Sequence, residues 1–205
     1  MKPQTPSRSH TGEGGGRLFV VSAPSGAGKS TICNAVLEKI SGLKYSVSAT
    51  TRSPRGEEKD GVDYHFVSKD EFLAGIQNGT WAEWAQVHGY YYGTSAVFID
   101  EALSTGCDVL LDIDVQGARQ LLKRYPDCVT IFIMPPSVAA LRERLLKRDT
   151  DSRAAIEQRL INAQEEMAQK GSYHHIIVND RLSEAIAALS AIISCARTGS
   201  GDGSS

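Results

Sequence analysis

Short apolar runs alternate with amphipathic segments along most of the chain. Each run is rich in Val, Ile, Leu or Phe and is bounded by polar or turn residues, as in buried strands. These predicted strands cover 17–23, 108–114, 128–134 and 174–180. A segment with helical spacing follows each strand, at 30–40, 116–126, 137–148 and 183–194. Strands that are apolar on both faces occur in parallel sheets covered by helices, so the pattern predicts a doubly wound α/β fold.

Two regions interrupt this alternation. Region 48–98 is polar and aromatic, and its clearest element is a helix at 69–77 that begins at Ser68 with Glu71 three residues later. It is too long for a loop, so we expect an inserted lobe. Region 142–169 is helical and rich in arginine, with a break at 148–152. The remaining core is predicted at 17–47, 99–141 and 170–197.

Composition narrows the class of protein. The 205 residues suit one domain, and 41% apolar with 22% charged residues is typical of soluble globular proteins. A net charge of -2 argues against a non-specific nucleic-acid binder, and no run reaches the length of a membrane span. The Pro-, Ser- and Gly-rich ends, 1–16 and 198–205, are predicted to be a disordered leader and tail. The scattered cysteines indicate reduced core thiols in a cytoplasmic protein: Cys33, Cys107, Cys128 and Cys195.

The stretch "APSGAGKS", 23–30, joins the first predicted strand to the first predicted helix. Its glycines let backbone N–H groups turn toward an anion, and the helix N-terminus adds positive potential. Lys29 can reach the β- and γ-phosphates of ATP, and the Ser30 hydroxyl can bind Mg²⁺. Ala23 stands where this motif usually has a glycine, but the rest of the pattern is intact. The predicted ATP-binding residues here are Ser25, Gly26, Ala27, Gly28, Lys29, Ser30 and Thr31.

An aspartate near the end of the second predicted strand supports this site. Asp112 should lie at the carboxyl edge of the sheet, where the phosphate loop also lies. We therefore predict that Asp112 holds Mg²⁺, directly or through water. Without the loop, a solvated aspartate would be the better interpretation.

The acceptor of the phosphate is less clear from residue types alone. Arg52 and Arg55 lie in a turn-rich segment near Ser48 and Tyr64. Guanidinium groups bind phosphate oxygens in pairs, and tyrosine hydroxyls can complete such a site. The alternative is a solvated basic loop, which these residues alone favour. Its partners would be the neighbouring carboxylates Glu57, Glu58 and Asp60.

Taken together, four segments closely resemble the guanylate kinase family. They are "SAPSGAGKS", "TTRSPRGEEKDGVDYHF", "EWAQVHGYYYGT" and "LDIDVQG", and the resemblance runs from about Arg17 to Leu189. It implies a P-loop NTPase-type core with an inserted mixed α+β GMP-binding lobe at 48–98 and a helical lid at 142–169. It also implies Mg²⁺-dependent transfer of the ATP γ-phosphoryl group to GMP or dGMP.

The resemblance assigns the residues of the acceptor site. The GMP phosphate would be held by Arg52, Arg55, Tyr64 and Tyr92. The base would be bound by Glu83, with Ser48, Thr94 and Asp114 assisting. Guanine offers two adjacent N–H donors to a carboxylate, whereas adenine presents an acceptor, so such a site can reject the wrong base by roughly 10⁴-fold. The alternative for Glu83 is an outward-facing side chain on an alternating strand.

The resemblance also gives the arginines of the second region a role. Arg144 and Arg148 are four residues apart and would share a helix face, which alone would indicate a solvated stripe. The family implies that Arg144, Arg148 and Arg159 close over the phosphoryl group, with Lys29 and Arg52 completing the catalytic set. Asn179 would lie near the adenine of ATP. No catalytic base is needed, because a phosphate monoester is largely dianionic at neutral pH.

Two alternatives remain open at this stage. One is a kinase for another nucleoside monophosphate. The other is a catalytically silent guanylate-kinase-like module that binds proteins. The partners expected from the resemblance are ATP and GMP, without nucleic acid or membrane, and it leaves formation of a homo-oligomer open.

Overall fold

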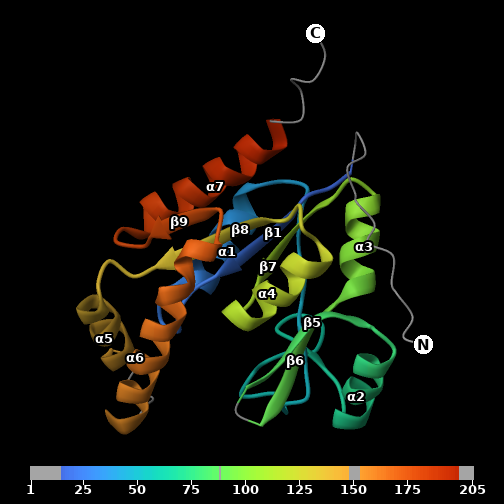
Figure 1. Cartoon of the computed structure of the whole chain (residues 1–205), viewed down its shortest axis with the longest axis horizontal. Helices are drawn as coiled ribbons and strands as arrows, with labels where there is room; N and C mark the ends of the chain where they lie inside the picture. The colour runs from blue at the N-terminus through green and yellow to red at the C-terminus, as the bar shows by residue number, and fades with distance from the viewer. Residues whose placement is uncertain (1–14, 88, 148–152, 199–205) are drawn as a thin grey trace. The chain divides into compact units, whose positions relative to one another are not determined.

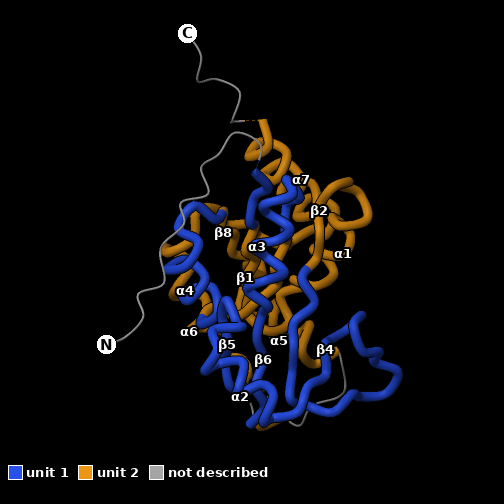
Figure 2. The backbone as a smooth tube through the Cα atoms, turned by 90° about the vertical axis from the view of Figure 1, so that its right-hand side faces the viewer, with its two compact units in different colours: residues 1–18, 46–109, 116–128 blue, residues 19–45, 110–115, 129–205 orange. Residues whose placement is uncertain are grey.

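The computed structural model describes residues 15–87, 89–147 and 153–198 (Figure 1). The chain divides into two compact units, which Figure 2 shows in different colours. Unit 1 consists of 1–18, 46–109 and 116–128, and unit 2 consists of 19–45, 110–115 and 129–205.

A five-stranded sheet in the order β2-β7-β1-β8-β9 lies mostly in unit 2. Its strands are β1 Leu18–Ser22, β2 Leu43–Tyr45, β7 Asp108–Asp112, β8 Val129–Met134 and β9 His175–Val178. β1 pairs in parallel with β8, and β8 pairs in parallel with β9. All five residues of β1 are buried, as expected for a strand covered on both faces. The predicted doubly wound parallel sheet is thus confirmed.

Two helices of unit 2 pack against this sheet. Apolar residues of α1 (Lys29–Lys39) and α7 (Leu182–Thr198) form one buried cluster with the strands. This cluster includes Phe19, Ile32, Val36, Ile131, Ile177 and Leu189. Farther along the unit, α5 (Val138–Leu146) and α6 (Arg153–Ala168) lie side by side and are followed by the 3₁₀ turn η1 (Gln169–Ser172) (Figure 1). Their own small core contains Leu141, Leu145, Ile156, Leu160 and Ala163.

Unit 1 contains a mixed sheet in the order β4-β3-β6-β5. The strands are β3 Ala49–Thr50, β4 His65–Phe66, β5 Trp81–Val87 and β6 Tyr90–Ser95. β3 pairs in parallel with β4, whereas β6 pairs antiparallel with both β3 and β5. Helix α2 (Lys69–Gln77) covers aromatic residues of this sheet, because the ring of Phe72 stacks on Trp81 at 4.5 Å and on Tyr91 at 5.4 Å between centroids. The unit also holds α3 (Ala96–Ser104) and residues 116–124 of α4 (Val115–Arg124).

Several sequence expectations can be compared with these elements. Every predicted strand and helix is present within a few residues of its expected ends, but α3 and the five strands β2 to β6 were not predicted. The predicted lobe 48–98 falls in unit 1 and the predicted lid 142–169 in unit 2, although this finer subdivision stays a prediction. Residues 1–14 of the predicted leader and 199–205 of the tail lie outside the described residues.

The cysteines do not all match their prediction. Cys33 and Cys128 are buried and Cys107 is half-buried, whereas Cys195 is exposed. The interpretation as a core thiol is therefore wrong for Cys195. Among the described residues, no helix combines the length and the apolar character needed to cross a bilayer.

Candidate functional site

The phosphate loop of unit 2 follows directly from β1. Gly26 has φ 91° and Gly28 has φ 93°, a left-handed conformation that residues other than glycine rarely adopt. A Cβ atom on Gly28 would lie 2.5 Å from Nδ2 of Asn179, and one on Gly26 would lie 2.9 Å from Cδ2 of Leu145. Both glycines are thus required by the turn and by the packing behind it.

Helix α1 begins at the end of this loop without a side-chain cap. Gly28 occupies the N-cap position and has no side chain that could accept a hydrogen bond from the first turn. The first backbone N–H groups of a helix have no partner within the helix and attract anions. The loop turn itself is held by a hydrogen bond from the Ala27 backbone N–H to the Pro24 carbonyl, 3.0 Å long. The start of α1 therefore presents donors suited to phosphate oxygens.

Three predicted site residues form one polar cluster beside the loop. Nζ of Lys29 lies 3.1 Å from Oδ1 of Asp112, and the Ser30 hydroxyl donates to Oδ2 of Asp112 at 3.1 Å. Lys29 also donates to the carbonyl of Ile113 at 3.5 Å. The cluster joins a cation for phosphate with a hydroxyl and a carboxylate, which are hard oxygen ligands of the kind that Mg²⁺ binds.

Asn179 and Arg144 are attached to the back of the phosphate loop. Asn179 is 5% exposed, and its Nδ2 donates to the carbonyl of Ala27 at 2.7 Å. Arg144 donates from Nη2 to the Asn179 carbonyl at 2.7 Å and from Nη1 to the Ala27 carbonyl at 3.5 Å. The structure thus brings Arg144 and Asn179 together with the loop. Arg159 is half-buried on α6, and Arg148 lies outside the described residues.

In unit 1, Glu83 and Thr94 lie opposite each other on β5 and β6. Glu83 is 5% exposed and Thr94 is fully buried, and the Thr94 hydroxyl donates to Oε1 of Glu83 at 2.6 Å. The alternative of an outward-facing Glu83 is therefore wrong. Ser48 is half-buried just before β3. Asp114 belongs to unit 2, after β7, where its carbonyl accepts from the Ser22 hydroxyl at 3.5 Å.

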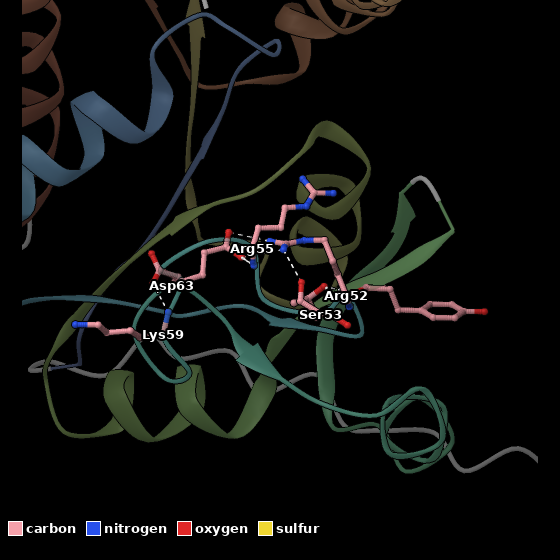
Figure 3. A network of polar contacts seen from close by, with 8 residues as sticks. Arg52, Ser53, Arg55, Lys59 and Asp63 are labelled. Carbon is pink, nitrogen blue, oxygen red and sulfur yellow. Dashed lines mark hydrogen bonds and ion pairs between the residues drawn. The ribbon is translucent and has the colours of Figure 1, made fainter. Parts of the chain in front are cut away.

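Arg52 is the centre of a second polar network in unit 1 (Figure 3). Its guanidinium donates from Nη1 to the Ser53 carbonyl and to Oε2 of Glu58, both at 2.8 Å, and from Nη2 to Oε1 of Glu58 at 3.0 Å. The hydrogen bond to Glu58 and, to a smaller extent, the hydrogen bond to Tyr92 raise the pKa of Arg52. The same bond to Arg52 is the main reason why the pKa of Glu58 is lowered. The Cζ atom of Arg52 also lies 5.3 Å from the centroid of the Tyr64 ring.

This network changes the interpretation of the basic loop. Arg52 is only 6% exposed, so the alternative of a solvated loop is wrong for Arg52. The pairing with Glu58 that this interpretation included is present. Arg55 is exposed, and its backbone N–H donates to Oε2 of Glu58 at 2.7 Å. The rings of Tyr64 and Tyr92 are 5.9 Å apart, so the four residues assigned to the GMP phosphate lie on neighbouring parts of one unit.

Two further residues are visible only in the structure. The Gln120 side chain donates to the Trp84 carbonyl at 2.7 Å and accepts from its backbone N–H at 3.2 Å, which continues the hydrogen bonding of edge strand β5 next to Glu83. Glu166 of α6 has a raised pKa, first because of burial and then because of the negative charge of Asp114. The sequence gives no signal for either contact, because each depends on a packing between distant segments.

Comparison with known proteins shows which family the chain is similar to. The sequence profile of the guanylate kinase family matches residues 15–196. The guanylate kinase of Alcanivorax borkumensis is 47% identical over 182 residues, covering 89% of this chain and 88% of the relative. That of Symbiobacterium thermophilum is 48% identical over 178 residues, covering 87% of this chain and 84% of the relative.

A solved structure shows that the fold is also similar to that of a guanylate kinase. The crystal structure of guanylate kinase from Anaplasma phagocytophilum matches with a TM-score of 0.75 and 34% identity, covering 90% of this chain and 88% of that chain. The profile match covers the phosphate loop and the segment that contains Glu83 and Thr94, and both sequence relatives align over most of the chain. The chain therefore belongs to the guanylate kinase family.

Proposed function

We propose that this protein transfers the γ-phosphoryl group of ATP to GMP, or to dGMP, and releases ADP and GDP. The observation that carries the proposal is the buried Glu83–Thr94 pair in a chain that also has the Lys29–Ser30–Asp112 cluster. The cluster suits a nucleoside triphosphate, and the carboxylate suits guanine. A cytoplasmic location, without nucleic-acid or membrane partners, is part of this proposal.

At the donor site, the loop residues 25–31 would surround the ATP phosphates. The uncapped N-terminus of α1 supplies backbone N–H donors, and Lys29 supplies a positive charge. The Ser30 hydroxyl and the Asp112 carboxylate would hold Mg²⁺, which neutralises phosphate charge when it is bound. Mg²⁺ commonly takes one or two carboxylates together with phosphate and water oxygens, so a single aspartate is sufficient. Asn179 would contact the adenine from behind the loop.

At the acceptor site, Glu83 would accept the two N–H donors on the guanine edge. The Thr94 hydroxyl already donates a hydrogen bond to Oε1, which fixes the orientation of the carboxylate before the base arrives. Ser48 and Asp114 would assist at the base. Arg52, Arg55, Tyr64 and Tyr92 would hold the phosphate of GMP, where a guanidinium and a hydroxyl both donate hydrogen bonds to its oxygens.

The transfer step requires alignment and charge neutralisation more than it requires a base. The GMP phosphate attacks as a dianion, so no side chain has to remove a proton. Lys29 and the arginines Arg52, Arg144, Arg148 and Arg159 would stabilise the charge that spreads over the transferring group. In the structure Arg144 is bonded to backbone carbonyls at the loop, so this role requires it to exchange those partners for phosphate oxygens.

A phosphorylation assay with Mg-ATP and a panel of acceptors tests this function. We expect turnover with GMP and dGMP to exceed that with AMP, CMP, UMP and dTMP, because only guanine presents two adjacent donors to Glu83. Preference for AMP or a pyrimidine would overturn the guanine assignment. Failure to bind Mg-ATP would favour the silent protein-binding module instead. The Lys29→Met variant is the control, since it should lose roughly 10²-fold or more in rate while it still binds GMP.

A further inference from the structure

Glu58 lies in the loop that follows β3 and contacts the two arginines that are proposed to bind the GMP phosphate. It is half-buried, and each of its carboxylate oxygens accepts from an arginine that the proposed function assigns to the GMP phosphate. Oε1 accepts from Nη2 of Arg52 at 3.0 Å, and Oε2 accepts from Nη1 of Arg52 at 2.8 Å. Oε2 also accepts from the backbone N–H of Arg55 at 2.7 Å. One carboxylate therefore connects both arginines.

The geometry leaves part of the Arg52 guanidinium available. A guanidinium has five N–H donors in one plane. The bonds to Glu58 use the end formed by Nη1 and Nη2, and Nη1 also donates to the Ser53 carbonyl at 2.8 Å. These three bonds use three of the five N–H donors. The others are left for the further hydrogen bond with Tyr92 and for an external phosphate.

Two observations distinguish a positioning role from simple competition with phosphate. Arg52 is 6% exposed, and a buried charge requires a partner at all times, including when GMP is absent. The bond from the Arg55 backbone N–H holds the turn itself and involves no side chain that would bind phosphate. A carboxylate that only occupied the phosphate position would not need this second contact.

We propose that Glu58 is a positioning residue for the acceptor phosphate. It fixes the plane of the Arg52 guanidinium and the start of the Arg55 side chain, so that both arginines are arranged before GMP arrives. Preorganised donors bind an anion more tightly, because less side-chain freedom is lost on binding. This inference rests on the proposed function, which places the GMP phosphate at Arg52 and Arg55.

Calorimetric titration of the full chain with GMP and with guanosine tests this role, because guanosine lacks the phosphate. Glu58→Gln should weaken GMP binding roughly tenfold or more and leave the affinities for guanosine and for Mg-ATP unchanged. Glu58→Asp keeps the charge but is too short to reach both arginines, so it should also weaken GMP selectively. Glu57→Gln removes a charge from the same exposed loop and should leave both affinities unchanged.

Each other outcome overturns the inference. Tighter GMP binding by Glu58→Gln would mean that Glu58 competes with phosphate. Equal losses for GMP and guanosine would mean that it only supports the fold. If Glu57→Gln and Glu58→Gln had equal effects, or if Glu58→Asp had none, Glu58 would act only through its negative charge. If Arg52→Ala weakens GMP and Glu58→Gln does not, this inference alone fails. If Arg52→Ala has no effect, the assignment of the phosphate site fails.

Discussion

At the scale of single residues, two of the charged side chains that unit 1 buries, Arg52 and Glu83, each have a specific partner. Arg52 is paired with Glu58 in a two-point contact, and Glu83 accepts a short bond from Thr94. Burying a charge without a partner is costly, so such residues are retained where a fixed charge is useful. A cation prepared for an anion and a carboxylate prepared for N–H donors are what a guanine mononucleotide requires.

Glu83 offers the sharpest test of base recognition. Glu83→Gln replaces one acceptor oxygen by an NH₂ group, which would face a donor of guanine and lose a charge-assisted hydrogen bond. We expect kcat/KM for GMP to fall roughly 10- to 100-fold while the KM for ATP is unchanged. Steady-state kinetics with each substrate varied measures this. The exposed Glu101→Gln on α3 is the matched control, and a loss that affects both substrates equally would contradict the assignment.

The residues of the phosphate loop could be identified from their order in the sequence, because a strand, glycines and Gly-Lys-Ser imply one local geometry. The surroundings of Arg52 could not. Three carboxylates, Glu57, Glu58 and Asp60, lie within a few residues of it, and only the path of the turn decides that Glu58 is the partner. Asp60 instead accepts from the backbone N–H of Phe66 at 2.8 Å.

At the scale of elements, helix α2 shows how local sequence fixes a boundary. The Ser68 hydroxyl accepts from the Glu71 backbone N–H at 3.2 Å, and the Glu71 carboxylate accepts from the Ser68 backbone N–H at 2.8 Å. The predicted helix, 69–77, coincides with the observed Lys69–Gln77. Phe72 of this helix stacks on Trp81, so the capped helix is tied to the sheet that carries Glu83.

Ser68→Ala should therefore reduce stability without changing specificity. The loss of an N-cap side chain costs about 1 kcal/mol in the free energy of unfolding. Urea denaturation followed by circular dichroism measures the change as a lower midpoint with an unchanged slope. The KM values for GMP and ATP should stay the same. A change in KM for GMP alone would mean that the cap also positions the acceptor site.

Helix α6 carries Glu166, a carboxyl group whose ionisation is unfavourable in the folded protein. Burial, and next the charge of Asp114, raises the pKa of Glu166. A carboxyl whose pKa rises on folding holds its proton more tightly in the folded state, so stability falls as pH increases from its ordinary pKa through the folded one. Glu166→Gln should therefore increase the free energy of unfolding at about pH 8 and change it little at about pH 4.

Thermal unfolding of this variant and the parent protein across this range measures the difference. The exposed Glu143→Gln on α5 is a matched control and should not change the pH dependence. A difference between Glu166→Gln and the parent that is larger at low pH would contradict the assigned direction of the shift.

Two of the elements that the sequence did not predict, α3 and β2, show the physical reason for the omission. α3 begins at Ala96 directly after β6, with no glycine or proline to mark the change from strand to helix. Its N-cap, Ser95, is also the last residue of the strand. β2 has three residues, none of them fully buried, so no apolar run identifies it. Periodicity detects long elements with a clear apolar face, and these two lack one of those properties.

At the scale of the whole molecule, the residues proposed for the two nucleotides are divided mainly between the two units. Unit 2 contains the phosphate loop and Asp112, and unit 1 contains Glu83 and the Arg52 network. Assignments to both units follow from motifs that are far apart in the sequence. A sequence can identify such motifs separately, but the packing contacts of Gln120 and Glu166 arise only when the chain has folded.

This division predicts independent binding of ATP and GMP. Each ligand at roughly 100 times its Kd should add ~2.7 kcal/mol to the free energy of unfolding. The two stabilisations should add when both ligands are present, and Lys29→Met should reduce only the effect of ATP. Differential scanning fluorimetry with each ligand and with an unreactive ATP analogue plus GMP measures this. Competition between the two would contradict separate sites.

The distribution of the cysteines has a practical consequence for covalent labelling. Only a thiolate reacts readily with alkylating reagents. Burial, followed by the charge of Asp112, raises the pKa of Cys33 to about 12, and burial raises that of Cys128 to about 11. Cys195 is exposed on α7, so a dye or spin label should attach there while Cys33 and Cys128 stay unmodified. With the half-buried Cys107 changed to serine, the protein would carry one reporter, on unit 2, without any introduced cysteine.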